Sequence, residues 1–459
     1  MSQVVKDRRS LPPIALILVF GLVAWGAYKL IPYLLNGLFH NNSSPIANRM
    51  SLGDKILVAS ATTAEKQAGV KAFAKGDYKE AAKQFQASLQ QNRNDPETVI
   101  YLNNALASDR TPLKIAVSVP IASNPNVAQE ILRGVAQAQD EINLKGGIKA
   151  AGLQVEIVSD DNSPEVAKEV AAALTNDPKT LAVIGHNSSQ ASLAAAPIYQ
   201  QAKLVMVTPT SSTKNLSGFG SYIFRTVPTL ISMAMPLAKY AVETAGKTNI
   251  AFCYDSQSTE NLLSKDEFVA SFLAAGGKLV PTVCDFAAPT FNPKNAIADA
   301  ANNGAQGLML APQIDRIDRA IELARANQGK LALYGSSTLY TIQTLKEGQN
   351  DINGLVLSVP WHPETNPGNP FPENARQRWG GIVNWRTATS YDAAQAIIAG
   401  LQQSNTRLEL QKALRNPSFS ATGASENVKF LPTGDRAGKA ILVEVKPGGK
   451  TGYTFVPLP

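Results

Sequence analysis

Two short segments rich in serine and threonine carry the residues best suited to hold a small ligand. Each follows an apolar run, the first also opens a helical pattern, and the candidate contacts in them are Ser188, Ser189, Thr210, Ser211 and Ser212. Backbone N–H groups at the start of a helix favour an anion such as a carboxylate, and hydroxyls can add donors. The alternative is that these hydroxyls only cap helices.

Motifs for covalent, phosphate or metal chemistry are absent from the sequence. The serines of GHNSSQ do not form a GxSxG elbow, and there is no GxGxxG or GxxxxGK[ST] loop. The three histidines, His40, His186 and His362, lie far apart, and the two cysteines lack CxxC spacing. We therefore expect a binding protein that is not an enzyme and that needs no metal or cofactor.

From Pro112 onward, strand-like runs alternate with amphipathic helices. The runs are Lys114–Val119, Leu153–Val158, Leu181–Gly185, Leu204–Thr208, Asn249–Asp255, Lys278–Phe286, Gly307–Ala311, Leu331–Gly335 and Gly354–Val359. Repeated strand–helix units predict parallel sheets with helices on both faces, and this many strands favours two Rossmann-like lobes. Ligands bind such sheets beyond the carboxyl ends of the strands.

Six segments together resemble the branched-chain amino-acid type (type 1) of periplasmic binding protein, the substrate-binding component of ABC importers. They are RGVAQAQDEINLKGGI (133–148), SDDNSPEVAKEVAAAL (159–174), VIGHNSSQAS (183–192), VTPTSS (207–212), FRTVPT (224–229) and SYDAAQAI (390–397). The resemblance covers about three quarters of the chain. It implies an α/β domain at 111–459 whose two lobes close about a hinge. Lobe 1 would be 112–234 and 362–425, and lobe 2 would be 235–361 and 426–459.

The same resemblance implies a ligand site between the lobes. Ser189 matches the family position that holds the ligand carboxylate, and Thr210 and Ser212 match positions that contact the carboxylate and the amino group. His186 also lies in the family motif, where a structural hydrogen bond is the expected role. The candidate contacts from lobe 2 are Asp255, Ser258, Gln313, Ser337 and Trp361.

Lobe 2 departs from the family where the ligand amine would be held. The tyrosine expected after the strand ending at Asp255 is missing, and Ser336–Thr338 replaces the expected acidic residue. A buried ammonium without a counter-charge is unfavourable. The substitute would be one of Asp255, Glu260, Asp315 or a cation–π contact with Trp361, for which interlobe packing is the other interpretation. Otherwise the ligand lacks an amine, as an amide, urea-like compound or carboxylate would.

Cys253 and Cys284 lie in consecutive expected strands of lobe 2. Outside the cytoplasm a disulfide between them is permitted, and two free buried thiols are the alternative.

An apolar segment at residues 11–39 follows Lys6, Arg8 and Arg9. It predicts either a cleaved signal peptide or a retained transmembrane anchor. The weak match to a cleavage site favours the anchor, with residues 1–40 as tail and anchor and 41–62 as linker. The positive N-terminal flank predicts a cytoplasmic N-terminus and places the bulk of the chain in the periplasm or extracellular space.

Residues 63–110 predict a helical hairpin that resembles a tetratricopeptide repeat. The pattern AxxxxGVKAFAKGDYKEAAKQFQASL covers one repeat and part of another, fewer than a stable solenoid usually needs. Two roles remain open: a helical spacer packed on its neighbour, and a module that docks a protein partner.

The 459 residues carry a formal net charge of +7, and the basic residues are scattered among acidic ones. A nucleic-acid surface usually shows a concentrated basic stripe, so no nucleic-acid partner is expected. Three functions fit these features. The first is a tethered binding protein that serves ABC permease subunits, and the others are a ligand-sensing receptor ectodomain and an envelope scaffold.

Overall fold

The computed structural model describes residues 46–59, 62–424 and 426–459. Arg49 to Pro459 form one compact unit. The predicted anchor at residues 11–39 lies outside the described residues. Within the described ranges, no helix combines the length and apolar character that crossing a bilayer requires.

Two sheets form the framework. The first contains six strands in the order β1-β3-β2-β4-β5-β6, and the second contains seven in the order β13-β12-β11-β10-β9-β7-β8. The strands of the first sheet are β1 (Met50–Ser51), β2 (Leu113–Val119), β3 (Leu153–Ser159), β4 (Thr180–Ile184), β5 (Val205–Thr208) and β6 (Ile223–Arg225). Those of the second are β7 (Asn249–Tyr254), β8 (Lys278–Val280), β9 (Gly307–Ala311), β10 (Ala332–Gly335), β11 (Val356–Val359), β12 (Ile441–Pro447) and β13 (Tyr453–Pro457).

The parallel core of each sheet confirms the prediction of two α/β lobes. The pairs from β2 to β6 and from β7 to β11 are parallel. The strand expected over Lys278–Phe286 ends at Val280, because Pro281 has no N–H to continue the ladder. The antiparallel strands β1, β12 and β13 are additions that the sequence pattern did not predict.

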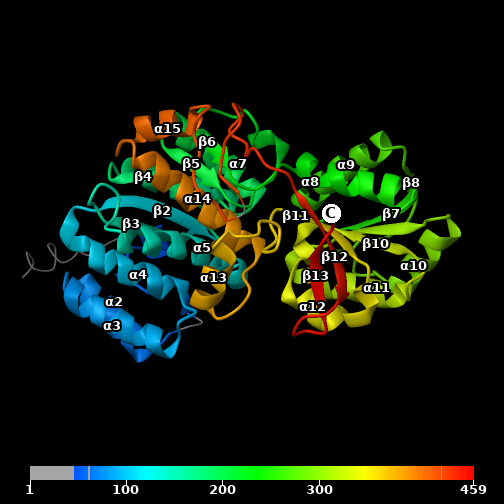
Figure 1. Ribbon diagram of the computed structural model, residues 1–459, viewed down its shortest axis with the longest axis horizontal. Coiled ribbons are helices and arrows are strands. Elements are labelled where there is room, and N and C mark those ends of the chain that lie inside the picture. Colours follow the sequence, from blue (N-terminus) through cyan, green and yellow to red (C-terminus); the bar gives the residue numbers. More distant parts are fainter. Residues whose placement is uncertain (1–45, 60–61, 425) are drawn as a thin grey trace, which may run out of the picture. The chain divides into compact units, whose positions relative to one another are not determined.

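Helices cover the sheets, and Figure 1 shows them on both faces of the strands. They are α2 (Ala64–Ala74), α3 (Tyr78–Gln91), α4 (Pro96–Ala107), α5 (Pro125–Leu144), α6 (Pro164–Asn176), α7 (Ser189–Gln201), α8 (Leu230–Lys239), α9 (Thr259–Ala274), α10 (Pro293–Asn302), α11 (Ile317–Asn327), α12 (Ile342–Gly348), α13 (Phe371–Trp379), α14 (Trp385–Leu401) and α15 (Arg407–Arg415). The short helices are η1 (Ala47–Arg49), η3 (Ser108–Arg110), η4 (Lys214–Leu216), η5 (Tyr240–Thr244), η6 (Ile314–Arg316), η7 (Ser337–Leu339) and η8 (Gln349–Ile352).

Local sequence explains where the helices begin and end. Ser163 accepts a hydrogen bond from the backbone of Val166 and precedes a proline in the first turn of α6, as the pattern predicts. Gly146 and Gly147 follow α5 with φ angles of 95° and 87°, a conformation that side chains disfavour.

Lobe 1 consists of the first sheet with α5–α7 and α13–α15, and lobe 2 consists of the second sheet with α8–α12. Figure 1 shows the orange helices α14 and α15 among the elements of lobe 1. Helix α14 packs closely on α5 at Gly134, where a Cβ atom would collide with the carbonyl oxygen of Thr387. The chain was expected to pass from lobe 1 back into lobe 2 at residue 426, but it does so later. Asp435 and Arg436 still pair with Arg225 and Asp392 of lobe 1, which places the crossing between Arg436 and β12.

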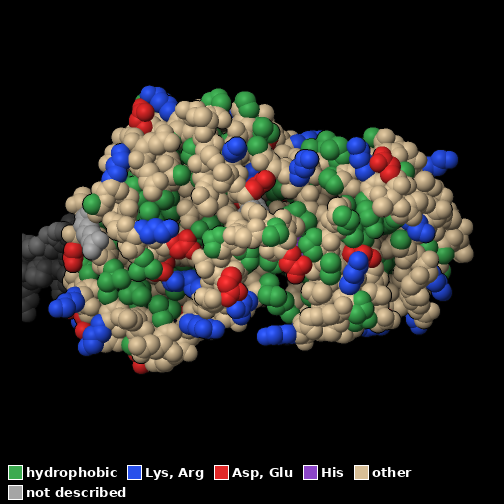
Figure 2. All heavy atoms as spheres, viewed as in Figure 1, with side chains coloured by type: hydrophobic (Ala, Val, Ile, Leu, Met, Phe, Trp, Pro, Cys, Tyr) green, Lys and Arg blue, Asp and Glu red, His purple; other side chains and the backbone are tan. Residues whose placement is uncertain are grey.

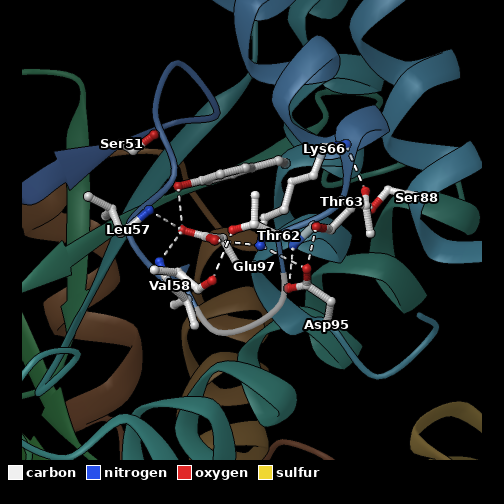
Figure 3. A network of polar contacts seen from close by, with 12 residues as sticks. Ser51, Leu57, Val58, Thr62, Thr63, Lys66, Ser88, Asp95 and Glu97 are labelled. Atoms are coloured by element: carbon white, nitrogen blue, oxygen red, sulfur yellow. Dashed lines mark hydrogen bonds and ion pairs between the residues drawn. The ribbon is translucent and has the colours of Figure 1, made fainter. Parts of the chain in front are cut away.

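A buried ionic network joins α2 to α4 and to the segment that precedes α2. The Nζ atom of Lys66 lies 2.7 Å from Asp95 Oδ2 and 2.7 Å from Glu97 Oε2, and the Lys66 side chain is fully buried. Glu97 Oε1 accepts hydrogen bonds from the backbone N–H groups of Leu57 (2.7 Å) and Val58 (3.1 Å). Figure 3 shows the side chains of Lys66, Asp95 and Glu97 pointing toward one another between α2, the start of α4 and the segment before α2.

Polar side chains also join α4 and α5 to the outer edge of β3. Asn104 donates to the carbonyl oxygen of Val155 and accepts from its N–H, both at 2.8 Å. Asn143 makes the corresponding pair of hydrogen bonds with Leu153 at 3.0 and 2.8 Å. Met50 and Ser51 of β1 pair with the end of β3. These contacts favour the interpretation of residues 63–110 as a spacer packed on its neighbour.

Candidate functional site

A cavity of about 140 Å³ lies where the carboxyl ends of strands from both lobes face each other. Residues of both lobes line it: Asn187, Thr210, Ser212, Val227, Leu230, Met233, Ala234, Leu237, Glu260, Asn261, Ser264, Phe268, Met309, Gly335, Ser336, Ser337, Thr338, Ser358, Trp385 and Arg386. A dry cavity of ~150 Å³ is large enough to hold benzene. The cavity is therefore large enough for a small organic ligand of about the size of benzene.

Thr210 and Ser212 form the polar wall from lobe 1. Thr210 Oγ1 donates to the carbonyl oxygen of Asn187 at 2.8 Å, which ties the loop after β5 to the loop after β4. The carbonyl oxygen of Ser212 accepts from the N–H of Leu230 at 3.1 Å, at the start of α8. The structure thus brings these two predicted residues to the cavity.

Ser189 lies at the first turn of α7 and is 3% exposed. Its N–H and its Oγ donate to Glu260 Oε1 of lobe 2 at 2.8 and 2.6 Å. Ser211 Oγ in turn donates to Ser189 Oγ at 3.1 Å. Ser188 caps α7 by accepting from the backbone of Ala191. Ser189, which was predicted to bind the carboxylate of a ligand, therefore binds the carboxylate of Glu260 instead.

The lobe 2 wall carries hydroxyl groups with unused hydrogen-bonding capacity. Within the part of the chain that the structure describes, the buried Oγ atoms of Ser336 and Ser358 have no hydrogen-bond partner. Ser336 directly follows β10, and Ser358 lies in β11 and is 3% exposed. Buried hydroxyls are normally hydrogen-bonded, so these two are candidates to bind a polar ligand group. Ser337 also lines the cavity.

An apolar wall completes the cavity. Helix α8 of lobe 2 contributes several aliphatic side chains, and α9 and β9 add Phe268 and Met309. Leu237, Phe268 and Met309 are at most 3% exposed and belong to one hydrophobic cluster of lobe 2. A hydrocarbon group bound here gains roughly 25 cal/mol for each Å² of apolar surface removed from water.

Arg386 is the basic residue that lines the cavity, and other groups already engage it. Its guanidinium lies 3.2 Å from Glu130 Oε2 and 4.5 Å from the ring centroid of Trp385. Burial raises the pKa of the Glu130 carboxyl, and the charge of Arg386 opposes that rise. Trp385 Nε1 donates to the carbonyl oxygen of Ser337 at 3.3 Å and so links the two lobes.

The other candidates from lobe 2 do not line the cavity. Asp255 is fully buried and pairs with Arg316, and Ser258 caps α9 by accepting from Asn261. Trp361 donates from Nε1 to the carbonyl oxygen of Ala424 at 3.2 Å, a packing contact. Gln313 precedes η6 and is not among the lining residues, and Asp315 is exposed.

His186 has the structural environment expected for it. Its Nδ1 lies 2.6 Å from Asp160 Oδ2 and its Nε2 lies 3.1 Å from the hydroxyl of Tyr199, with the ring fully buried. Burial alone would raise the pKa of Asp160, but the hydrogen bonds from His186, Asn162 and Ser118 hold it below its ordinary value.

A disulfide joins Cys253 of β7 to Cys284 in the loop after β8. Among residues 46–59, 62–424 and 426–459, no group of three or more His, Cys, Asp or Glu side chains is arranged to hold a metal ion. On the described part of the face drawn in Figure 2, basic and acidic side chains are interspersed, in line with the scattered charge of the sequence.

The sequence did not single out Asn187, Ser336, Ser358 or Arg386. A usable signal existed for two of them, because Asn187 and Ser336 closely follow strands β4 and β10, where parallel sheets bind ligands. Ser358 and Arg386 carried no such signal. They reach the cavity only through the packing of β11 and α14.

Comparison with known proteins gives a consistent result. A family model described as periplasmic binding protein matches residues 112–450. The Leu/Ile/Val-binding protein of Escherichia coli (strain K12) is 28% identical over 323 residues, which cover 69% of this chain and 85% of that protein.

Two solved structures share the fold. An ABC transporter substrate-binding protein from Desulfitobacterium hafniense in complex with Leu has a TM-score of 0.64 at 23% identity and covers 75% of this chain and 100% of that one. A solute binding protein from R. palustris in complex with benzoate has a TM-score of 0.64 at 17% identity and covers 75% and 96%. These likenesses confirm the expected fold of two α/β lobes.

Proposed function

Because the chain belongs to the periplasmic binding protein family, we propose that it binds an amino acid or a related small polar compound outside the cytoplasm. It would deliver this ligand to the permease subunits of an ABC importer, without catalysing a reaction. The observation that carries the proposal is the cavity between the lobes, which combines the hydroxyl-bearing residues Thr210, Ser212 and Ser336–Thr338 with an apolar wall.

The relatives support the ligand class. The matched Escherichia coli protein is named for leucine, isoleucine and valine, which combine a charged head with an aliphatic side chain. Thr210 and Ser212 would contact the head, and the side chain would lie against α8, Phe268 and Met309. Amides and small carboxylates are the other ligands to test, because the fold also holds benzoate in one solved structure.

The membrane anchor belongs to this proposal on sequence grounds alone. Residues 11–39 would fix the chain in the inner membrane with its binding domain in the periplasm. Helices α2 and α3 would serve as a spacer or as a docking site for a protein partner. A receptor would use the same cavity, whereas an envelope scaffold would not need one.

The test is a thermal-shift panel on the purified full-length chain, with amino acids, amides, urea and small carboxylates. A ligand at about 100 times its dissociation constant stabilises the folded state by ~2.7 kcal/mol, which corresponds to a shift of about 3 °C for a unit of this size. A specific hit among small polar compounds supports the proposal. A well-folded protein that responds to none of them would overturn it.

A matched pair of variants locates the binding. Thr210 and Thr175 each donate a hydroxyl hydrogen bond to a backbone carbonyl, but only Thr210 lines the cavity. Thr210→Val is expected to lower the affinity for the ligand by about tenfold, since one hydrogen bond contributes ~1 kcal/mol or more. Thr175→Val is expected to leave the affinity unchanged. Equal affinities for the two variants would place the ligand elsewhere.

A further inference from the structure

The carboxylate site at the start of α7 is occupied by the protein's own Glu260. Two donors of Ser189, its N–H at 2.8 Å and its Oγ at 2.6 Å, converge on one oxygen of that carboxylate. Helix α7 has 13 residues, so its positive end favours an anion there as well. Any ligand whose carboxylate is to use these donors must displace Glu260.

Glu260 is also the acidic residue of the cavity wall. Among the described residues that line the cavity, it is the one carboxylate, and Arg386 on the opposite lobe is already paired with Glu130. A displaced Glu260 would therefore stay in the cavity as a negative charge close to the negative charge of the ligand. Two like charges a few ångströms apart in a site shielded from water repel strongly.

An ammonium group on the ligand removes this repulsion. An ammonium has three N–H donors, and lobe 2 offers the displaced carboxylate together with the Oγ atoms of Ser336 and Ser358. The two serine hydroxyls are buried and have no partner within the described residues, so they are available as acceptors. The acid that the family sequence pattern leads one to expect after β10 is absent, and Glu260 reaches the cavity from α9 instead.

We propose, on the basis of the proposed function, that Glu260 closes the empty site and becomes the counter-ion of the ligand ammonium in the complex. Glu260 then determines specificity: the ligand is a zwitterionic α-amino acid with an apolar side chain, and the same compound without its amino group is rejected. Glu260 also links the lobes in the empty protein, beside the 2.7 Å hydrogen bond from Gln190 Nε2 to Thr259 Oγ1.

The experiment measures the affinities of two probes for the full-length chain by calorimetry. The probes are L-leucine and 4-methylpentanoate, which is leucine without its amino group. We expect the unaltered protein to prefer leucine by about 100-fold or more. In Glu260→Gln, the affinity for leucine should fall by about tenfold or more, while the affinity for 4-methylpentanoate should stay the same or rise.

Two further variants separate this role from a structural one. Glu267 lies on the same helix and forms an interlobe ion pair with Lys214 at 3.0 Å, but it does not line the cavity. Glu267→Gln should keep the preference for leucine. Ser189→Ala removes a donor that both probes would use, so it should weaken both by a similar factor.

The outcomes distinguish the two proposals. A protein that binds neither leucine nor any other amino acid of the panel overturns the proposed function, and this inference with it. Leucine and 4-methylpentanoate binding equally well to the unaltered protein overturns the inference alone. So does a Glu260→Gln variant, folded by its thermal unfolding curve, that keeps the preference or loses both probes to the same extent.

Discussion

Replacing Lys66 by methionine should open the α2–α4 region of the molecule without affecting the ligand site. The substitution keeps most of the side-chain volume but leaves Asp95 and Glu97 buried without their cation. Removing one partner of a buried ion pair typically costs about 3–5 kcal/mol. Because Glu97 also holds the backbone of Leu57 and Val58, the loss should spread to the segment before α2.

The loss should depend on pH. Burial raises the pKa of the Glu97 carboxyl above its ordinary value, and the charge of Lys66 opposes this rise. A carboxyl with a higher pKa in the folded state binds its proton more tightly there than in the unfolded chain, so stability falls as pH rises through the folded pKa. Without Lys66 the pKa rises further, and each additional unit corresponds to about 1.4 kcal/mol. The Lys66→Met variant should therefore be less stable at pH 8 than at pH 5.

Hydrogen–deuterium exchange is the suitable assay, because it reports local opening in a chain too large for a single unfolding transition. Peptides from residues 62–107 should exchange at least 100-fold faster in the variant, while lobe 2 peptides serve as the internal reference. Lys83→Met is the control, since the Lys83 side chain is 75% exposed and its ion pair with Glu80 is long at 3.6 Å. An increase in the exchange rate of less than about tenfold over the unaltered protein, or an increase that is equal at both pH values, would refute the reasoning.

Three other predictions follow from the described contacts. Reduction, or Cys253→Ser with Cys284→Ser, should lower stability by about 3–4 kcal/mol for a loop of 31 residues, and the unfolded, unreduced protein should show no free thiol. Two titratable thiols would show that the bridge does not form. Trp361→Phe should cost about 1 kcal/mol through the lost bond to Ala424 and leave ligand affinity within twofold, so a tenfold loss in calorimetry would place the indole in the site. Leu237→Ala should lower stability by roughly 2–5 kcal/mol and weaken aliphatic ligands, and unchanged affinity for them would contradict the role of the apolar wall.

The lobes could be predicted from the sequence because buried parallel strands have a strong local signature. Val205–Thr208 and Gly307–Ala311 are short apolar runs between helices, and both are strands. The antiparallel pair β12–β13 carries mixed polarity, with Val443 buried beside the more exposed Glu444, so its pattern is weaker. The end of β8 was missed because the apolar residues after Pro281 outweighed the missing N–H group in the pattern.

The lobe 1 half of the site was more accessible to sequence reasoning than the lobe 2 half, where Ser337 lines the cavity but the predicted Asp255, Ser258, Gln313 and Trp361 do not. Thr210 and Ser212 directly follow a strand, so their position was set by local order along the chain. Whether Asp255 or Glu260 faces the cavity depends on a turn of α9 and on the tertiary pairing of Asp255 with Arg316. A list of acidic residues near a strand end contains no information about which of them another side chain already neutralises.

The polar cover on β3 has a consequence for how the binding domain can be isolated. Without β1 and α4, the N–H and C=O groups of Val155 and Ile157 would form an open sheet edge, a template onto which a strand of another molecule can add. A fragment that begins at residue 111 would present this edge together with the apolar surface left by α4. Such a fragment should self-associate with increasing concentration, whereas one that begins at Arg49 should keep its edge closed. In that case residues 49–110 would keep the edge of lobe 1 from pairing with other molecules.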